Sequence, residues 1–291
     1  MSQFLAASEL ILNPDGSIYH CNLRPENLAD TVLLVGDPGR VPVVSAFFDH
    51  IEFKTQNREI VTHTGEKNGK RISVISTGMG TDNIDIVLNE LDALVNIDLV
   101  HKQIKPGRKQ LTFIRMGTSG SLQEDIPADA FLASTHGLGF DGLVHYYSGA
   151  EHLTRNAFID AFVEQTDWDA RLPRPYIAEA DPVLLEKAKK MGFYSGVTAT
   201  ATGFYGPQGR ILRLGIHQPQ LNEKLSAFRF NGQKITNFEM ETSGIYGLSN
   251  LFGHRALTVN CIIANRFTGQ HSKDARGSMM QLIERVLEEI C

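Results

Sequence analysis

The stretch TVLLVGDPGR, residues 31–40, has the pattern of a buried strand that stops at a tight turn. Residues 31–35 form a short apolar run with β-branched side chains, and Gly-Asp-Pro-Gly is a strong turn signal. The same plan recurs in RISVISTGMG, residues 71–80, where 72–76 is the apolar run. The next residues, 81–95, carry apolar side chains at helical spacing. Two strand–turn units, the second followed by a helix, indicate an α/β fold.

Further strand and helix signals follow along the chain. Apolar runs predict strands in LTFIRMGTSGS (111–121), AFLASTHGLGFDG (130–142), YSGVTATATGFYG (194–206) and RALTVNCIIANR (255–266). The first of these strands is expected to run into a turn made of Gly, Thr and Ser. Helical spacing predicts one helix directly after Glu241 and a last one at 278–291. Strands that alternate with helices predict a sheet packed on both faces.

Composition narrows the classes of function. A net charge of -5 argues against a general nucleic-acid binder, although it leaves room for a local basic pocket. The three cysteines, Cys21, Cys261 and Cys291, are scattered and have neither metal-site nor disulfide spacing, which favours a reducing cytosol. No apolar stretch reaches the length of a membrane span, and the first residues lack the positive charge of a secretory signal. We therefore expect a cytoplasmic protein that binds neither membrane nor nucleic acid.

The turns at the strand ends are rich in groups that bind anions. Arg40 follows the first turn, and Arg115 precedes the Gly, Thr and Ser of 117–120. Open α/β sheets bind ligands at such turns, and arginine offers a fork of donors that matches phosphate. The alternative is that these are ordinary tight turns with surface ion pairs. No dinucleotide fingerprint and no phosphate-binding loop of the nucleotide hydrolases is present in the sequence.

Four motifs occur together and in a fixed order: GDPGRV at 36–41, STGMG at 76–80, RMGTSG at 115–120 and NFEMET at 237–242. Together they resemble the purine and uridine phosphorylase family, over roughly residue 18 to the C-terminus. The resemblance implies an α/β, single-domain three-layer fold with a central mixed β-sheet flanked by helices. It divides the chain into an N-terminal extension, 1–30, and a nucleoside phosphorylase domain, 31–291.

In this family, phosphate attacks C1′ of the ribose and the base leaves. The resemblance implies that phosphate contacts Gly36, Arg40, Arg58, Arg115 and Thr118. It implies ribose contacts for His20, Met240 and Glu241. Arg58 and His20 resemble residues that the family lends to a neighbouring subunit. The resemblance therefore implies a homo-oligomer with active sites shared across a dimer interface.

The two glutamates of NFEMET leave alternatives open. The resemblance implies that Glu241 accepts hydrogen bonds from the 2′- and 3′-hydroxyls of ribose. An ionised carboxylate has two oxygen acceptors, one for each of these donors. Glu239 is either a partner of that carboxylate or a structural group. The alternative for the pair is that both glutamates lie at the N-terminus of the next helix, where the helix dipole favours negative charge.

The segment FYGPQGR, 204–210, resembles the base loop of the uridine branch of the family. The resemblance implies that Phe204 stacks on the base and that Gln208 pairs with N3–H and O2 of uracil. Arg210 would bind O4 and stabilise negative charge as uracil leaves. The purine branch carries an acid after the last core strand, where this chain has Ala264 and Asn265. Pattern alone would favour an ordinary Pro-Gly loop.

These residues imply a uridine phosphorylase, a pentosyltransferase of pyrimidine salvage, with Arg115, Arg210 and Glu241 as catalytic residues. Phosphate would be a co-substrate, and neither metal nor organic cofactor is expected. The alternatives are a purine nucleoside phosphorylase or nucleosidase of the same fold, or a non-catalytic nucleoside-binding protein. A longer segment at 96–110 and a small residue at Gly209 depart from the bacterial uridine pattern. The departures leave the oligomer size and the preference for uridine, thymidine or deoxyuridine open.

Overall fold

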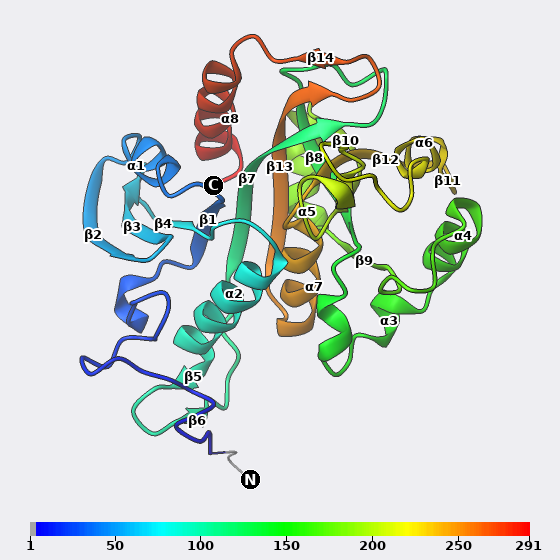
Figure 1. Cartoon of the computed structure of the whole chain (residues 1–291). Helices are drawn as coiled ribbons and strands as arrows, with labels where there is room; N and C mark the ends of the chain where they lie inside the picture. Colours follow the sequence, from blue (N-terminus) through cyan, green and yellow to red (C-terminus); the bar gives the residue numbers. More distant parts are fainter. Residues whose placement is uncertain (1–3) are drawn as a thin grey trace. The chain divides into compact units, whose positions relative to one another are not determined.

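The computed structural model describes residues 4–291 (Figure 1). Contacts within the chain divide it into two compact units. The first contains the residues up to Met79, Asn83–Ile114 and Phe252–Arg255, and the second contains Gly80–Asp82, Arg115–Leu251 and Ala256–Cys291. The boundary predicted at residue 30 stays a prediction, because residues on both of its sides share the first unit.

The first unit contains four neighbouring strands of a mixed sheet. Its elements are η1 (Pro25–Asn27), β1 (Thr31–Val35), α1 (Arg40–Ser45), β2 (His50–Asn57), β3 (Ile60–Lys67), β4 (Lys70–Ser76), most of α2 (Thr81–Asn96), β5 (Ile97–Asp98) and β6 (Gln103–Ile104). β1 pairs in parallel with β4, and β4, β3 and β2 form an antiparallel meander. The strands predicted at 31–35 and 72–76 and the helix predicted at 81–95 are confirmed.

The second unit contains the remaining elements, except for Phe252 of α7 and Arg255 of β13, which belong to the first unit. They are most of β7 (Thr112–Ser121), β8 (Phe131–Gly139), η2 (Leu143–Tyr146), α3 (Glu151–Thr154), α4 (Ala157–Thr166), β9 (Tyr176–Glu179), α5 (Pro182–Lys190), β10 (Tyr194–Thr200), η3 (Gly206–Gln208), α6 (Leu221–Ala227), β11 (Arg229–Phe230), β12 (Gln233–Glu239), α7 (Thr242–Phe252), β13 (Arg255–Asn265), β14 (Gln270–His271) and α8 (Ala275–Glu289). β8, β10 and β12 pair in parallel, while β13 is antiparallel to β8. The predicted α/β class with a mixed sheet and helices is confirmed.

The Gly/Thr/Ser segment after Arg115 is where the sequence prediction was wrong. It is not a turn, because β7 continues as a strand to Ser121. Its last residues pair with β12 in an antiparallel ladder, in which Ser121 lies opposite Asn237 and Gly120 opposite Phe238. Backbone pairing with a strand that is distant in sequence outweighs the local turn preference of Gly and Ser.

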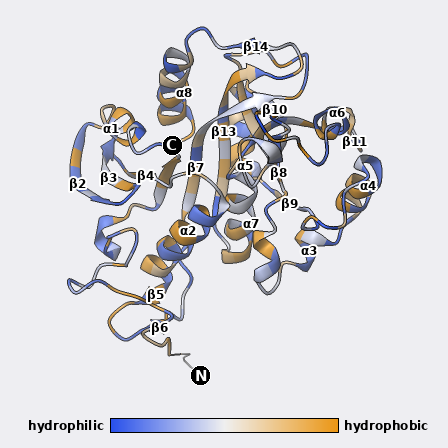
Figure 2. Ribbon diagram, viewed as in Figure 1, coloured by the Kyte–Doolittle hydropathy of each residue, from blue (hydrophilic) through white to orange (hydrophobic). Residues whose placement is uncertain are grey.

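The core of the second unit is unusually aromatic. Phe140, Phe158, Phe162, Phe228 and Phe238 pack in one buried cluster, with neighbouring ring centroids 5.1–6.0 Å apart. Such offset and edge-to-face pairs add to the gain from burying the rings. Figure 2 shows long hydrophobic stretches in β13 and α7, which agrees with their burial. Phe238 of this cluster lies on β12, the strand that carries the start of the NFEMET motif.

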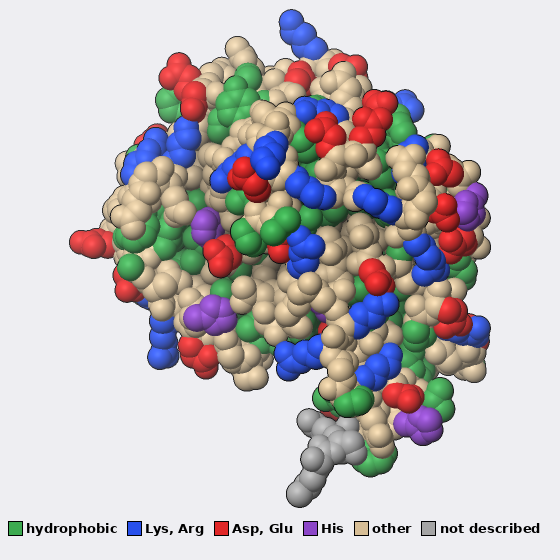
Figure 3. All heavy atoms as spheres, turned by 180° about the vertical axis from the view of Figure 1, so that it is seen from behind, with side chains coloured by type: hydrophobic (Ala, Val, Ile, Leu, Met, Phe, Trp, Pro, Cys, Tyr) green, Lys and Arg blue, Asp and Glu red, His purple; other side chains and the backbone are tan. Residues whose placement is uncertain are grey.

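The surface charge, the length of the helices and the state of the cysteines can be compared with the expectations from composition. Acidic and basic side chains are interspersed over the face drawn in Figure 3, as expected for a modest net charge. Among residues 4–291, no helix is both long enough and apolar enough to cross a membrane. Within the same residues, no cysteine forms a disulfide.

Candidate active site

Two of the sequence motifs meet through strand pairing. RMGTSG lies on β7 and NFEMET lies at the end of β12 and the start of α7. Because β7 and β12 pair antiparallel through Gly120 and Ser121, the two motifs occupy neighbouring strands. The result is a buried polar cluster of one arginine and two glutamates inside the aromatic second unit.

Arg115 is the centre of this cluster. It is only 5% exposed, and its Nη2 donates to Glu241 Oε2. Its Nη1 donates to Asn260 Oδ1 at 3.2 Å and lies 3.6 Å from Glu239 Oε2. Gly117 makes room for this side chain, since a Cβ there would lie 2.7 Å from Arg115 Cζ. These acceptors hold the guanidinium in one orientation.

Glu241 keeps acceptor capacity although it is buried. Its Oε1 accepts from the Gly80 amide at 2.8 Å and its Oε2 accepts from Arg115. A carboxylate has about four lone-pair sites, so two further donors fit. Burial raises the pKa of Glu241, and the Arg115 guanidinium opposes that shift. The two spare acceptors match the number of donors in a ribose diol.

Glu239 has a different role from Glu241. Its carboxylate accepts from the backbone amides of Glu241 and Thr242, both at 2.9 Å, at the N-terminus of α7. It also accepts from Thr200 Oγ1 at 2.6 Å. The helix-terminus alternative is therefore correct for Glu239, which is structural, whereas Glu241 points to Arg115 and Gly80 instead.

For the other predicted site residues the structure gives burial and place in the fold, and their roles stay predictions. In the second unit, Met240 and Thr118 are half-buried. In the first unit, Gly36 follows β1, Arg40 opens α1, and Arg58 is exposed in the β2–β3 turn with a φ of 53°. A non-glycine residue in this left-handed region is uncommon and fixes where the chain turns.

His20 is oriented by a carboxylate that sequence reasoning did not identify. Glu90 on α2 accepts from the backbone amides of His20 and Cys21, at 2.9 and 2.7 Å. Its Oε1 also lies 2.7 Å from His20 Nδ1. This contact fixes the ring and leaves Nε2 as the other polar atom. The apolar spacing of α2 identified the buried face of that helix but gave no signal for Glu90.

The base loop (residues 204–210) brings its three predicted residues together. Arg210 Nη1 donates to Gln208 Oε1 and to the Phe204 carbonyl, both at 2.6 Å. The Arg210 guanidinium carbon also lies 3.7 Å from the centre of the Phe204 ring. Gln208 is buried, whereas Phe204 is half exposed. The loop thus holds an amide, a guanidinium and an aromatic ring in one place, with the guanidinium over one face of the ring.

Two further residues hold this loop, and the sequence analysis assigned a role to neither. Arg266 Nη1 donates to the Gln208 carbonyl at 2.5 Å, and Asn222 Nδ2 donates to the same oxygen at 3.2 Å. Burial, with a smaller contribution from the Arg210 charge, lowers the pKa of Arg266 to about 10. Arg266 is the last residue of the run RALTVNCIIANR, 255–266, and directly follows β13. A charged residue at the end of a buried strand was the one signal that the sequence offered for it.

Both ends of the Asn265 side-chain amide form hydrogen bonds with backbone groups. Its Nδ2 donates to the carbonyls of Gln123 and Ile126, at 2.8 and 2.9 Å. Its Oδ1 accepts from the amides of Phe267 and Thr268, both at 2.9 Å. An amide with four such bonds has little capacity left for a base. The position that carries an acid in the purine branch is therefore structural in this chain.

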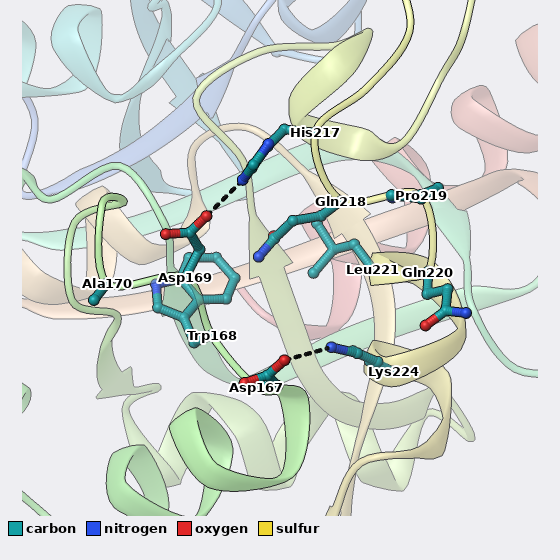
Figure 4. Close-up of a pocket in the computed structure, with 10 residues that line it drawn as sticks. All are labelled: Asp167, Trp168, Asp169, Ala170, His217, Gln218, Pro219, Gln220, Leu221 and Lys224. Atoms are coloured by element: carbon teal, nitrogen blue, oxygen red, sulfur yellow. Dashed lines mark hydrogen bonds and ion pairs between the residues drawn. The ribbon is translucent and has the colours of Figure 1, made fainter.

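Two cavities in the second unit contain none of the predicted site residues. One, of about 550 Å³, has Trp168 and Gln218 in its wall and is bordered by two ion pairs, His217–Asp169 at 2.6 Å and Lys224–Asp167 at 3.6 Å (Figure 4). The other, of about 360 Å³, is lined by Gly206 of the base loop together with Trp168. Neither brings together the charged groups needed for phosphate, so the Arg115 cluster is the stronger candidate for the chemistry.

A metal centre receives little support from the residues present. Over the part of the chain that the structure describes, one group has metal-ligand spacing, namely His50, Glu52 and Glu66. Arg71 Nε already donates to Glu52 Oε2 at 2.8 Å, and His50 and Glu52 are exposed. The expectation of no metal and no organic cofactor stays a prediction.

Comparison with known proteins agrees with the four motifs. The Phosphorylase superfamily matches residues 30–290. A uridine phosphorylase of Thermococcus kodakarensis is 30% identical, covering 94% of this chain and 86% of the relative. A DeoD-type purine nucleoside phosphorylase of Bacillus velezensis is 27% identical over 87% of this chain and 90% of its own length. The crystal structure of a Trypanosoma brucei nucleoside phosphorylase, described as showing uridine phosphorylase activity, has 33% identity and a TM-score of 0.88. It covers 97% of this chain and 99% of its own.

Proposed function

The chain belongs to the Phosphorylase superfamily, and on that premise we propose that it is a uridine phosphorylase. It converts uridine and inorganic phosphate to uracil and ribose 1-phosphate, in pyrimidine salvage in the cytoplasm. The observation that carries the proposal is the base loop, where Gln208, Arg210 and Phe204 are already assembled. The relatives named as uridine phosphorylases support the same substrate.

The base loop fits a pyrimidine with two carbonyls. The Gln208 amide can exchange hydrogen bonds with N3–H and O2 of uracil, while Arg210 binds O4. When the C1′–N1 bond breaks, its electron pair stays on the base, and negative charge spreads to O2 and O4. Arg210 is aimed at that charge, and Arg266 adds a second positive charge close to it. The structural role of Asn265 removes the polar side chain that a purine N7 would use.

The ribose and phosphate chemistry falls on the Arg115 cluster. Phosphate supplies the oxygen that bonds to C1′, and the ribose ring becomes positively charged as the base leaves. Glu241 binds the 2′- and 3′-hydroxyls with its two spare acceptors, and its negative charge stabilises the ring. Arg115 binds phosphate, and we also assign phosphate contacts to Gly36, Arg40, Arg58 and Thr118. Met240 packs on the sugar.

The proposal includes a homo-oligomer with shared sites. Arg58 is exposed in a tight turn, a position from which a side chain can reach a second copy. His20 is half-buried and is oriented by Glu90. In an isologous dimer each copy would lend these residues to its partner. Neither metal nor organic cofactor takes part in the proposed reaction.

The deciding experiment measures ultraviolet absorbance of uridine with and without phosphate, with inosine in parallel. We expect phosphate-dependent loss of uridine and at least 100-fold slower loss of inosine, because a site whose polar groups go unsatisfied rejects the wrong base by up to ~10⁴-fold. Full cleavage without phosphate would indicate a nucleosidase. Equal turnover of inosine would indicate a purine enzyme, and binding without turnover would indicate a non-catalytic protein.

A further inference from the structure

Arg115 has a neutral neighbour that no part of the proposed reaction uses. Asn260 lies on β13, and its Oδ1 accepts from Arg115 Nη1 at 3.2 Å. A Cβ at Gly117 would lie 2.8 Å from the same Oδ1. The guanidinium therefore fits between the backbone of β7 and the Asn260 amide. Its other terminal nitrogen is held by Glu241.

The Asn260 amide is retained at a cost in stability. The residue is fully buried, and its Nδ2 has no hydrogen-bond partner within residues 4–291. A buried donor without a partner is destabilising, and an apolar side chain of similar size would avoid that cost. The Nδ2 end is also closed to solvent, so it has no direct access to a ligand. The useful end of Asn260 is therefore Oδ1, which acts on Arg115.

A neutral acceptor suits this position for an electrostatic reason. The cluster already has two carboxylates, Glu239 and Glu241, beside a single guanidinium. A third carboxylate would make the cluster more negative and would repel a phosphate dianion. An amide oxygen holds Nη1 in place and adds no charge. Asn260 thus fixes the direction of the guanidinium without adding to the negative charge of the cluster.

We propose that Asn260 is a positioning residue of the phosphate subsite, which acts through Arg115 and sets the affinity for phosphate. The inference rests on the proposed function, since it takes Arg115 as a phosphate ligand. It adds a residue outside the four sequence motifs that identified the site. It also gives a reason for a buried amide that packing alone does not explain.

The test uses two variants and a matched control in the full chain. Asn260→Asp keeps the size and adds a charge, and Asn260→Ala removes the acceptor. Thr258→Val is the control, because Thr258 lies two residues earlier on the same strand and faces the same side. Its side chain is also fully buried. Inorganic phosphate is titrated into each protein by calorimetry, without nucleoside, and urea unfolding measures stability separately.

We expect Asn260→Asp to raise the Kd of phosphate at least ten-fold, about 1.4 kcal/mol, with a three- to ten-fold rise for Asn260→Ala. Thr258→Val should bind as wild type does. If Asn260→Asp does not fold, the alanine variant decides the question. Folded variants that bind phosphate within two-fold of wild type overturn the inference alone, while uridine cleavage by wild type leaves the proposed function intact. A wild-type protein that binds no phosphate overturns both.

Discussion

The Arg115–Glu241 pair should be strongly coupled in stability, because both groups are buried and Arg115 also serves Glu239. Replacing Arg115 with Met removes the positive charge and keeps most of the side-chain volume. At the 3.6 Å separation from Glu239, the Coulomb attraction is about 5 kcal/mol with an effective dielectric constant of 20. Desolvation offsets much of that attraction. Breaking one side of such a buried pair costs about 3–5 kcal/mol, so this is the expected loss for Arg115→Met.

The double variant gives the sharper test. In Arg115→Met alone, two buried carboxylates face each other without their cation. Adding Glu241→Gln removes one of those charges, so the double variant should be more stable than the sum of the single effects by about 2–3 kcal/mol. Glu241→Gln alone should cost less, because Arg115 keeps Glu239 and Asn260 as partners.

Urea unfolding at pH 7, monitored by far-ultraviolet circular dichroism, measures the free energy of unfolding of each variant. The exposed pair Lys234–Asp125, with a 2.7 Å contact, is the control. The corresponding cycle of Lys234→Met and Asp125→Asn should show a coupling below about 1 kcal/mol. If the Arg115 and Glu241 effects add to within about 0.5 kcal/mol, the buried pair does not contribute as the structure indicates.

Four further predictions follow from the site. Arg210→Leu should lower kcat on uridine more than it raises KM, because the charge that it binds develops during bond breaking, and a change confined to KM would contradict this role. Burial raises the pKa of Glu241, so on acidification kcat/KM should begin to fall above the ordinary glutamate value of 4.5, and a pH profile of uridine cleavage checks this. Trp168 is the one tryptophan of the chain and lines the cavity that the base loop borders, so saturating uracil should change the fluorescence of wild type but leave Trp168→Phe silent. Arg58→Ala and Arg115→Ala should each be nearly inactive alone. When the two variants are refolded together, activity should rise toward roughly a quarter of wild type, because each mixed dimer contains one intact site. If mixed dimers are shown to form and activity does not recover, Arg58 serves its own chain.

The local pattern was enough to identify the elements that carry the motifs. Short apolar runs ended by glycine turns gave β1 and β4, and helical spacing gave α2, α7 and α8. These predictions succeed because side-chain periodicity records which face of an element is buried. The contacts within residues 204–210 were also predictable, since Phe204, Gln208 and Arg210 are close along the chain and Arg210 contacts both of the others. Their role in binding the base stays a prediction.

The sequence alone therefore determined the fold class, the family and the identity of most candidate site residues. Only the tertiary structure decided what Glu239 and Glu241 hold. Glu239 caps α7, while Glu241 pairs with Arg115, a residue 126 positions away in the chain. That pairing depends on the extension of β7 through Gly120 and Ser121, which local turn preference argued against.

Arg266, Glu90 and Asn260 escaped sequence reasoning for the same physical reason. Each acts on a partner that is far away in the chain, respectively Gln208, His20 and Arg115. Local periodicity tells which side chains are buried, but it carries no information about which strand or helix packs next to them. The contacts of a buried polar group are fixed only when distant segments pack together.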